Sequence, residues 1–221
     1  MKPQIFASFH MDAKVPSAFD DRYTIICRND LRLNTNIKQV SDNSLKHIDA
    51  DTKEFFGDMT TFKFVYDNFD TLVDNDTTMI GFVQYKRGFR NIDNCDEDTI
   101  YKTPSYCCSS VLNQYYTNHP RIYLDKYLEI LKAKFQDKSE AIDAYFSAGD
   151  LHQHNMFICP VRGFKTLWGI WETVLPDYLQ YIKDNDLIKP RCLSWAGERI
   201  NDMILNVFIQ NPNMKILDIY S

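Results

Sequence analysis

Four polar side chains follow an apolar run near the middle of the chain. The run covers 79–83, and directly after it come Gln84, Tyr85, Lys86 and Arg87. In open α/β sheets ligands bind beyond the carboxyl ends of the strands, so these side chains would project toward a ligand. Two adjacent cations favour an anionic ligand, and a phosphate or diphosphate suits them best. The alternative interpretation is a solvated loop that begins with two charged residues.

Other polar residues stand where the same crevice would form. His10 follows a short apolar run over 4–9, and Asp58 begins a helical pattern over 58–69 as a suitable N-cap. The amino end of a helix favours anions, because its first N–H groups have no partner within the helix. In a parallel sheet, His10, the start of this helix and Gln84 would converge at one end.

The remaining pattern alternates between strands and helices. Apolar runs predict strands over 4–9, 23–27, 78–84 and 155–160, and a weaker one over 98–101. Helical spacing of apolar residues predicts helices over 58–69, 123–135, 164–182 and 194–209. Residues 31–55 are polar and irregular, which predicts a surface loop or a substrate loop. With no repeat and no linker, the order of elements predicts a single α/β domain over 1–221, a mixed central sheet flanked by helices.

The composition is that of a folded chain of moderate size. Its 221 residues are 44% hydrophobic and 14% aromatic, well above what a disordered chain carries. The formal net charge of −5 argues against general binding to nucleic acid or to an anionic membrane, which requires a basic face. The start of the chain lacks the apolar core of a signal peptide, and no apolar run approaches the ~18 residues of a membrane span. We therefore expect a cytoplasmic protein with no membrane span and no nucleic-acid partner.

Cysteines, histidines and paired aspartates give weak metal patterns. None of the six cysteines is spaced as Cys-x-x-Cys, so we expect reduced thiols, with those in apolar runs buried in the core. Asp150, His152 and His154 could hold a divalent metal only on a regular strand, where alternate residues point the same way. Asp74 and Asp76 imitate the Asp-x-Asp pair of many nucleotide-sugar enzymes. They precede their strand, so a solvated turn is the better interpretation.

Glu198 and Arg199 stand early in the last predicted helix, after the small residues Ala196 and Gly197. A carboxylate beside a glycine on a helix face can approach a ligand closely. The plainer interpretation is a surface glutamate paired with a neighbour, and the residues alone favour it.

Seven short segments keep a characteristic order along nearly the whole chain. They are Ser-Phe-His at 8–10, Asp-Asn at 42–43, Asp-Met-Thr at 58–60, Ile-Gly-Phe-Val-Gln-Tyr-Lys-Arg-Gly-Phe at 80–89, Tyr-Tyr-Thr-Asn-His at 115–119, Asn-Met-Phe-Ile at 155–158 and Glu-Arg-Ile at 198–200. This order resembles a family of small glycosyltransferases found in bacterial capsular and lipopolysaccharide clusters and in some large viruses, many of them known only as a domain of unknown function. The resemblance implies a GT-A type, Rossmann-like fold, a nucleotide-diphosphate sugar as donor, with UDP as the carrier, and hexosyl transfer to a growing glycan.

The resemblance also implies roles for particular residues. The donor's base and ribose would lie over the first two strands and the helix from Asp58, and its diphosphate on Lys86 and Arg87. Glu198 would be the general base of an inverting displacement, and Arg199 would orient it or contact phosphate. Asn155 would bind a sugar hydroxyl. The full set of expected substrate-binding residues is Ser8, His10, Asp58, Thr60, Gln84, Tyr85, Lys86, Arg87, His119, His154 and Asn155.

Three residues depart from the family pattern. Gln84 stands where the family has histidine, Lys86 where it has arginine, and Gly88 where it has an aromatic residue. An amide does not titrate, so an acid, base or ligand role of that histidine does not carry over, whereas hydrogen bonding does. The fold type implies Mn²⁺ or Mg²⁺, but the cations at 86–87 could neutralise the leaving diphosphate instead, so metal dependence stays open.

Two other classes of function fit the residues. The 13 tyrosines and 3 tryptophans could stack on sugars in a non-catalytic glycan- or nucleotide-binding module, which predicts binding without turnover. A metal-dependent nucleotide hydrolase would use His152 and His154, which predicts loss of activity on chelation. The donor sugar, the acceptor and the linkage stay open, because they depend on contacts to one or two hydroxyls.

Overall fold

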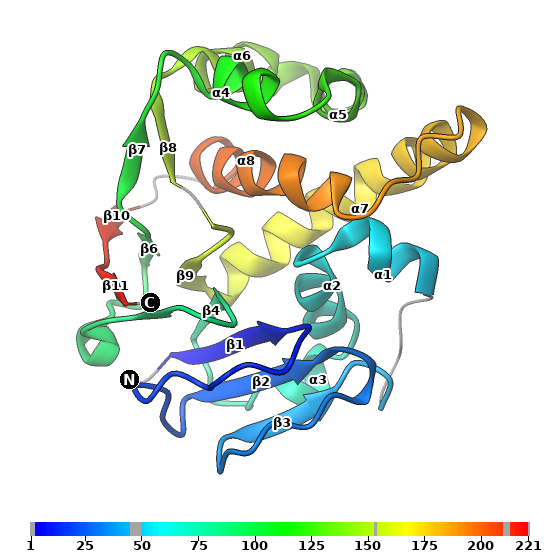
Figure 1. Cartoon of the computed structure of the whole chain (residues 1–221). Coiled ribbons are helices and arrows are strands. Elements are labelled where there is room, and N and C mark those ends of the chain that lie inside the picture. Colours follow the sequence, from blue (N-terminus) through cyan, green and yellow to red (C-terminus); the bar gives the residue numbers. More distant parts are fainter. Residues whose placement is uncertain (1–2, 45–49, 153, 210–212, 221) are drawn as a thin grey trace.

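A seven-stranded mixed sheet forms the centre of the molecule. The computed structural model describes residues 3–44, 50–152, 154–209 and 213–220 (Figure 1). In spatial order the strands are β3 (Lys38–Ser41), β2 (Tyr23–Cys27), β1 (Gln4–Phe9), β4 (Met79–Gln84), β9 (Phe157–Pro160), β6 (Thr99–Lys102) and β10 (Asn213–Ile216). The first four of these run parallel, and β9 lies antiparallel between β4 and β6. The carboxyl ends of four neighbouring strands therefore share one edge of the sheet.

The central strands are buried on both faces, which explains their continuous apolar sequences. Phe6 pairs with Phe82 and belongs to one apolar cluster, while Ile5 and Ala7 beside it belong to the cluster on the opposite face. This alternation is the period of two expected for a strand. A shift of register by one residue would exchange the two faces, so the core fixes the position of the polar residues at the strand ends.

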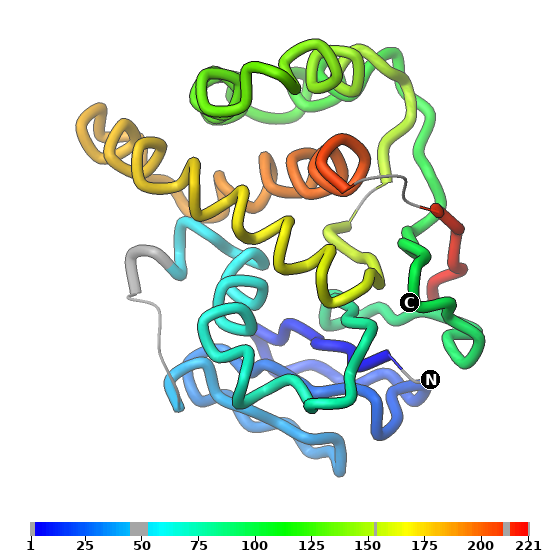
Figure 2. The backbone as a smooth tube through the Cα atoms, turned by 180° about the vertical axis from the view of Figure 1, so that it is seen from behind, coloured from blue at the N-terminus to red at the C-terminus, as the bar shows by residue number. Residues whose placement is uncertain are grey.

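Helices cover one face of the sheet and form a further layer beyond it. The helices are α1 (Ala50–Phe56), α2 (Met59–Asp67), α3 (Phe69–Leu72), α4 (Val111–Asn118), α5 (Arg121–Lys134), α6 (Ser139–Ser147), α7 (Val161–Asp184) and α8 (Cys192–Val207). Seen from behind, α2 and α7 lie across the sheet (Figure 2), and the ring of Phe82 contacts Phe62 of α2 at 4.3 Å and Phe164 of α7 at 4.9 Å. α4, α5 and α6 lie farthest from the sheet, with α8 between them and the strands (Figure 1). None of the helices in the described ranges is long and apolar enough to cross a membrane.

The structure confirms the predicted fold class and corrects parts of the element map. Residues 31–55 were expected to be a loop, yet they contain β3 and the start of α1. β3 has a single apolar residue, Val40, and lies at the sheet edge, so its sequence carries no alternating pattern. The helices α3, α4 and α6 and the edge strand β10 also lacked a prediction. The remaining elements without one are short: the pairs β7 (Ser105–Cys107) with β8 (Asp150–His152) and β5 (Gly88–Phe89) with β11 (Ile219–Tyr220), and the 3-10 turns at Arg28–Asp30, Ile92–Asn94 and Gln136–Lys138.

Two smaller points concern the cysteines and Gly88. All six cysteines are free thiols, and Cys27, Cys159 and Cys192 are buried, as expected. At Gly88 the ring of Tyr220 from β11 occupies the space that a Cβ would take, so the close pairing of β5 with β11 depends on glycine at this position.

Candidate functional site

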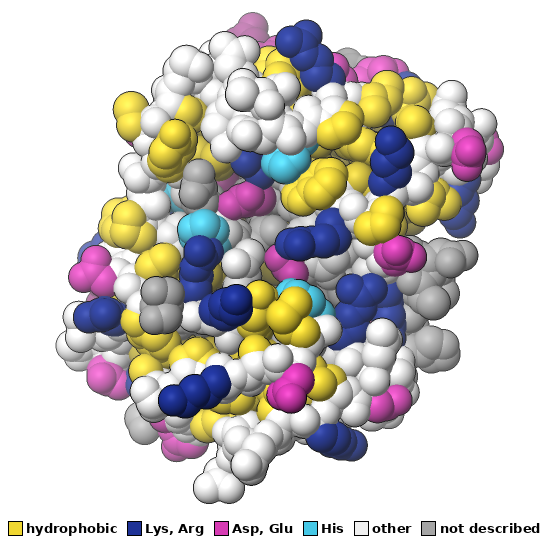
Figure 3. Space-filling model, in the orientation of Figure 1, with side chains coloured by type: hydrophobic (Ala, Val, Ile, Leu, Met, Phe, Trp, Pro, Cys, Tyr) yellow, Lys and Arg dark blue, Asp and Glu magenta, His cyan; other side chains and the backbone are white. Residues whose placement is uncertain are grey.

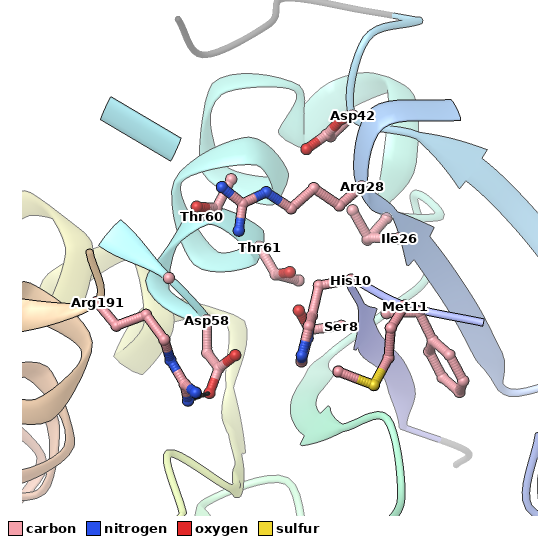
Figure 4. A pocket seen from close by; sticks show the side chains of 12 residues that line it. Ser8, His10, Met11, Ile26, Arg28, Asp42, Asp58, Thr60, Thr61 and Arg191 are labelled. Carbon is pink, nitrogen blue, oxygen red and sulfur yellow. Dashed lines mark ion pairs between the residues drawn. The ribbon is translucent and has the colours of Figure 1, made fainter. Parts of the chain in front are cut away.

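A cavity opens at the carboxyl edge of the parallel strands. It has a volume of about 280 Å³, and the residue immediately after each of β1, β2 and β3 lines it: His10, Arg28 and Asp42. Figure 4 shows Arg28 and His10 reaching into this space from the strand ends, and Asp58 and Arg191 from the helical side. The other lining residues are Ser8, Phe9, Met11, Ile26, Gly57, Thr60 and Thr61.

The electrostatics of this cavity favour an anion. Burial lowers the pKa of His10, and Asp58 opposes that shift. Arg191, Arg28 and Lys86 each lower it further. His10 is therefore a neutral imidazole at neutral pH, facing three cations and one carboxylate. Asp42 adds little negative charge, because Lys53 pairs with it at 2.9 Å and both side chains are almost fully buried.

Arg28 has an unused donor in this cavity. Its Nε is buried, and within the described part of the chain no group accepts a hydrogen bond from it. A buried N–H without an acceptor costs about 1–3 kcal/mol, so native proteins rarely leave one without a partner or ligand.

Asp58 has a different role from the predicted N-cap. It precedes α2 as expected, but its carboxylate makes no capping hydrogen bond. Instead Asp58 accepts a hydrogen bond from Gln84 Nε2 at 3.3 Å and lies 3.8 Å from Arg191. Gln84 also accepts a weak contact from Arg87 at 3.5 Å. The end of β4 and the start of α2 are thus joined at the rim of the cavity.

Tyr85 and Lys86 complete this rim. The ring of Tyr85 meets His10 edge-on at 4.8 Å, and the ammonium of Lys86 lies 5.1 Å from the Tyr85 ring centre. Lys86 itself is exposed, whereas Arg87 is half-buried. The cation pair therefore offers one exposed charge and one partly buried charge.

Glu198 of α8 forms the second half of the site. Its carboxylate accepts a hydrogen bond from the backbone N–H of His154 and another from Arg199 at 2.7 Å. His154 and Asn155 have φ values of 81° and 53°, in the left-handed region that residues other than glycine rarely adopt. Strain of about 1–3 kcal/mol per such residue persists only where surrounding contacts enforce it, and it concentrates at functional sites.

Gly197 has a packing role on α8. A Cβ at Gly197 would lie 2.9 Å from the sulfur of Met59, so this glycine lets α8 pack closely against α2. The close packing brings the starts of both helices to the same cleft.

Arg199 is enclosed by protein groups. Its side chain is 4% exposed and donates twice to Gln114 Oε1, at 3.2 and 2.6 Å, and once to the carbonyl of Trp195. Arg199 also donates a hydrogen bond to Glu198, so it has the geometry to orient that carboxylate.

His154 links the two halves of the site. Burial lowers its pKa, the nearby Arg87 adds to the shift, and Glu198 opposes it. Arg87 at the end of β4 and Glu198 on α8 therefore act on the same imidazole. Asn155 follows, with its side-chain oxygen held by Asn201 at 3.0 Å. Figure 3 shows charged side chains of both signs and histidines along a hollow between the strands and the helical layer.

His119 packs against α8 on the helical side of the site. Its ring stacks on Trp195 of α8, with centroids 4.7 Å apart and planes 15° apart. Burial and the charge of Arg199 lower the pKa of His119 to about 4, so it is neutral under ordinary conditions.

The histidine cluster expected as an alternative metal site does not form. β8 ends at His152, whose Nδ1 lies 2.6 Å from the carbonyl of Thr103, whereas His154 lies on the strained segment. Among the described residues, no group of three or more His, Cys, Asp or Glu could hold a metal ion. Asp74 and Asp76 lie with Gln4 at the opposite, amino edge of the sheet, as predicted.

The apo structure of WbbM, a bifunctional glycosyltransferase, is similar to this chain over 99% of its length, with a TM-score of 0.71 and 15% sequence identity. This chain has a glycosyltransferase-like fold. It spans 45% of the WbbM chain, and no protein-family model and no curated protein sequence matches it. At this identity the similarity establishes the fold alone, and the reaction has to be argued from the site.

Arg28 and Arg191 are two cationic cavity residues that the sequence interpretation missed. The rule that identified His10, a polar residue directly after a buried strand, applies equally to Arg28 after β2. Arg191 gives no such signal. It precedes α8 with a φ of 63° and reaches Asp58 across 133 residues of sequence, which only the tertiary fold can show.

Proposed function

We propose that this chain is a glycosyltransferase that moves a hexosyl group from a nucleotide-diphosphate sugar, with UDP as the carrier, to a glycan acceptor. One observation carries the proposal: Arg191, directly before α8, lines the cation-rich cavity at the strand ends, and farther along the same helix the carboxylate of Glu198 is held by the N–H of His154. An anion site and a candidate base next to each other are what sugar transfer from a diphosphate requires.

The nucleoside and the diphosphate of the donor lie at different parts of the cavity rim. The nucleoside lies over the ends of β1 and β2, where Arg28 offers its free N–H and neutral His10 offers a polar ring. The diphosphate lies toward Arg87, Lys86 and Arg191. These cations stabilise the charge that develops on the leaving group.

Glu198 then acts as the general base. The acceptor oxygen forms a bond to the anomeric carbon while the bond from that carbon to the diphosphate oxygen breaks. The acceptor proton passes to Glu198, and the electron pair leaves with the diphosphate. Attack from the face opposite the leaving group inverts the anomeric carbon. Arg199 and the N–H of His154 hold the carboxylate in place for this step.

Metal ions have a secondary place in this proposal. Asp58, the carboxylate at the cavity rim, is already engaged by Gln84 and Arg191, so it fits a metal ligand poorly. We expect EDTA to lower transfer by less than ~10-fold, because side-chain cations supply most of the charge that a metal would supply. Transfer measured with EDTA and again after added Mn²⁺ or Mg²⁺ tests this. Complete loss with EDTA and full recovery with Mn²⁺ would show that the diphosphate depends on a metal.

The first test of the donor site is calorimetry with UDP, GDP, CMP and uridine. Arg87→Ala should weaken UDP binding by roughly 1.5–3 kcal/mol, the range for a charge-assisted hydrogen bond, and leave uridine binding nearly unchanged. Arg162→Ala is the matched control, since Arg162 is an exposed arginine paired with Asp98 outside the site. An equal loss for uridine and UDP would contradict a phosphate role for Arg87, as would a loss in the control.

A further inference from the structure

One face of α8 points into the cleft. Trp195, Glu198 and Asp202 are spaced by three and four residues and so share this face, and Arg191 precedes them by four. Arg191 meets Asp58 and Glu198 meets the N–H of His154, whereas Asp202 forms a buried pair with Lys102. Trp195 lies between Arg191 and Glu198, within about one helical turn of each.

Trp195 differs from the other tryptophans. Trp168 and Trp171 are fully buried, whereas Trp195 is partly exposed. His119 stacks on Trp195 and is backed in turn by Tyr115, with ring centres 5.1 Å apart. The indole is therefore braced on one side by His119, and part of its surface stays exposed.

Trp195 lies outside the cavity assigned to the donor. Arg191 lines that cavity and Trp195 does not. Because Arg191 comes before Trp195 on α8 and Glu198 comes after it, the indole adjoins the base on a part of the cleft that the cavity does not cover. A group bound on the indole would place its hydroxyls near Glu198 without displacing the nucleotide.

We propose that Trp195 is the platform of the acceptor subsite, on which one pyranose ring of the acceptor glycan stacks while presenting a hydroxyl to Glu198. The face of an indole carries negative charge density, and the axial C–H groups on one face of a pyranose are weakly positive and apolar, so the two surfaces attract. This inference rests on the proposed function, because it assigns the second substrate of the same site.

Tryptophan fluorescence tests the subsite directly. Acrylamide quenching reports on Trp195, because the other two tryptophans are fully buried. The probes are the methyl glycosides of glucose, galactose, mannose and N-acetylglucosamine, each with and without UDP. We expect at least one glycoside to lower the quenching constant by ~2-fold or more, since a stacked ring excludes the quencher. UDP alone should leave the quenching of Trp195 nearly unchanged.

Two variants distinguish stacking from simple packing. The saturation-transfer NMR signal of the protecting glycoside should fall by ~5-fold in Trp195→Leu, because leucine keeps apolar volume but has no π-face. Most of that signal should remain in Trp195→Phe, which keeps an aromatic ring. Tyr106→Leu, at an aromatic residue that is 53% exposed on β7, is the control and should bind as the wild type does. UDP affinity, measured for every variant, shows whether each remains folded.

Each contrary result has a defined meaning. Protection by none of the glycosides overturns the subsite, as does equal glycoside binding in wild type and Trp195→Leu. Protection by UDP alone also overturns it, because the indole would then belong to the donor. A protein that binds a glycoside on Trp195 but fails to bind UDP would retain the subsite and refute the proposed function, so the two failures are distinguishable.

Discussion

Replacing Glu198 with glutamine is expected to lower glycosyl transfer by ~10²–10⁴-fold while leaving donor affinity nearly constant. Glutamine keeps the size of the side chain and an oxygen for the N–H of His154, but it cannot take up the acceptor proton. The measurement is transfer under single-turnover conditions, together with calorimetric binding of UDP. Such a separation of rate from binding identifies a group that acts in the transition state.

Glu129→Gln supplies the matched control for Glu198. Glu129 is an exposed glutamate of α5 paired with Lys126, and its replacement should change stability by at most about 0.5 kcal/mol and leave transfer unaffected. Near-normal transfer by Glu198→Gln would remove Glu198 as the base. The imidazole of His154, whose pKa is lowered by burial and by Arg87 while Glu198 opposes that shift, would then be the next group to replace. A protein that binds UDP and glycosides in every variant but never turns over the donor would instead be a binding module.

The sequence predicts the part of the fold that depends on continuous burial. The runs that became β1, β2 and β4 are apolar on both faces, and the long stripes of α5, α7 and α8 repeat at helical spacing, so local pattern and tertiary environment agree. β3 and β10 could not be found in this way. β10 is exposed throughout, and β3 is an edge strand with a single apolar residue, so neither carries a pattern of burial.

The candidate site was predictable only at the strand ends. His10 and Gln84 follow buried strands, and the topological rule brings them to one edge of the sheet. The hydrogen bond between Glu198 and the N–H of His154 depends on two positive φ values in non-glycine residues, for which the sequence offers no sign. The effect of Arg87 on the same His154 likewise becomes visible only in the folded structure, where α8 packs on α2.

The buried pair of Lys102 and Asp202 adjoins this site. The two side chains are 2% and 5% exposed, and Nζ lies 2.5 Å from Oδ1. Burial lowers the pKa of Lys102, and Asp202 opposes the shift, so the cost of removing the ammonium from water outweighs the attraction of its partner. The pair therefore contributes little net stability, although breaking it leaves an isolated buried charge.

Lys102→Met should accordingly destabilise the fold by about 3–5 kcal/mol, because Asp202 would remain buried without a cation. Lys102→Met combined with Asp202→Asn should recover most of that loss, since it removes both charges and keeps an amide oxygen for the hydroxyl of Tyr145 and the N–H of His152. Urea unfolding of the wild type, the single variant and the double variant measures this. A double variant as unstable as the single one would show that the pair itself stabilises the fold.

Transfer by the double variant separates the stabilising role of this pair from a positioning role. Asp202 accepts a hydrogen bond from the backbone N–H of His152, and Glu198 accepts one from the backbone N–H of His154, two residues later. Asp202 and Glu198 also lie on the same face of α8. If the charge of the pair helps to fix this segment, the double variant should be folded and bind UDP normally, yet transfer more slowly than the wild type by ~10-fold or more. Wild-type transfer in a stable double variant would mean that the amide alone positions His152 and that the ion pair has no part in the reaction.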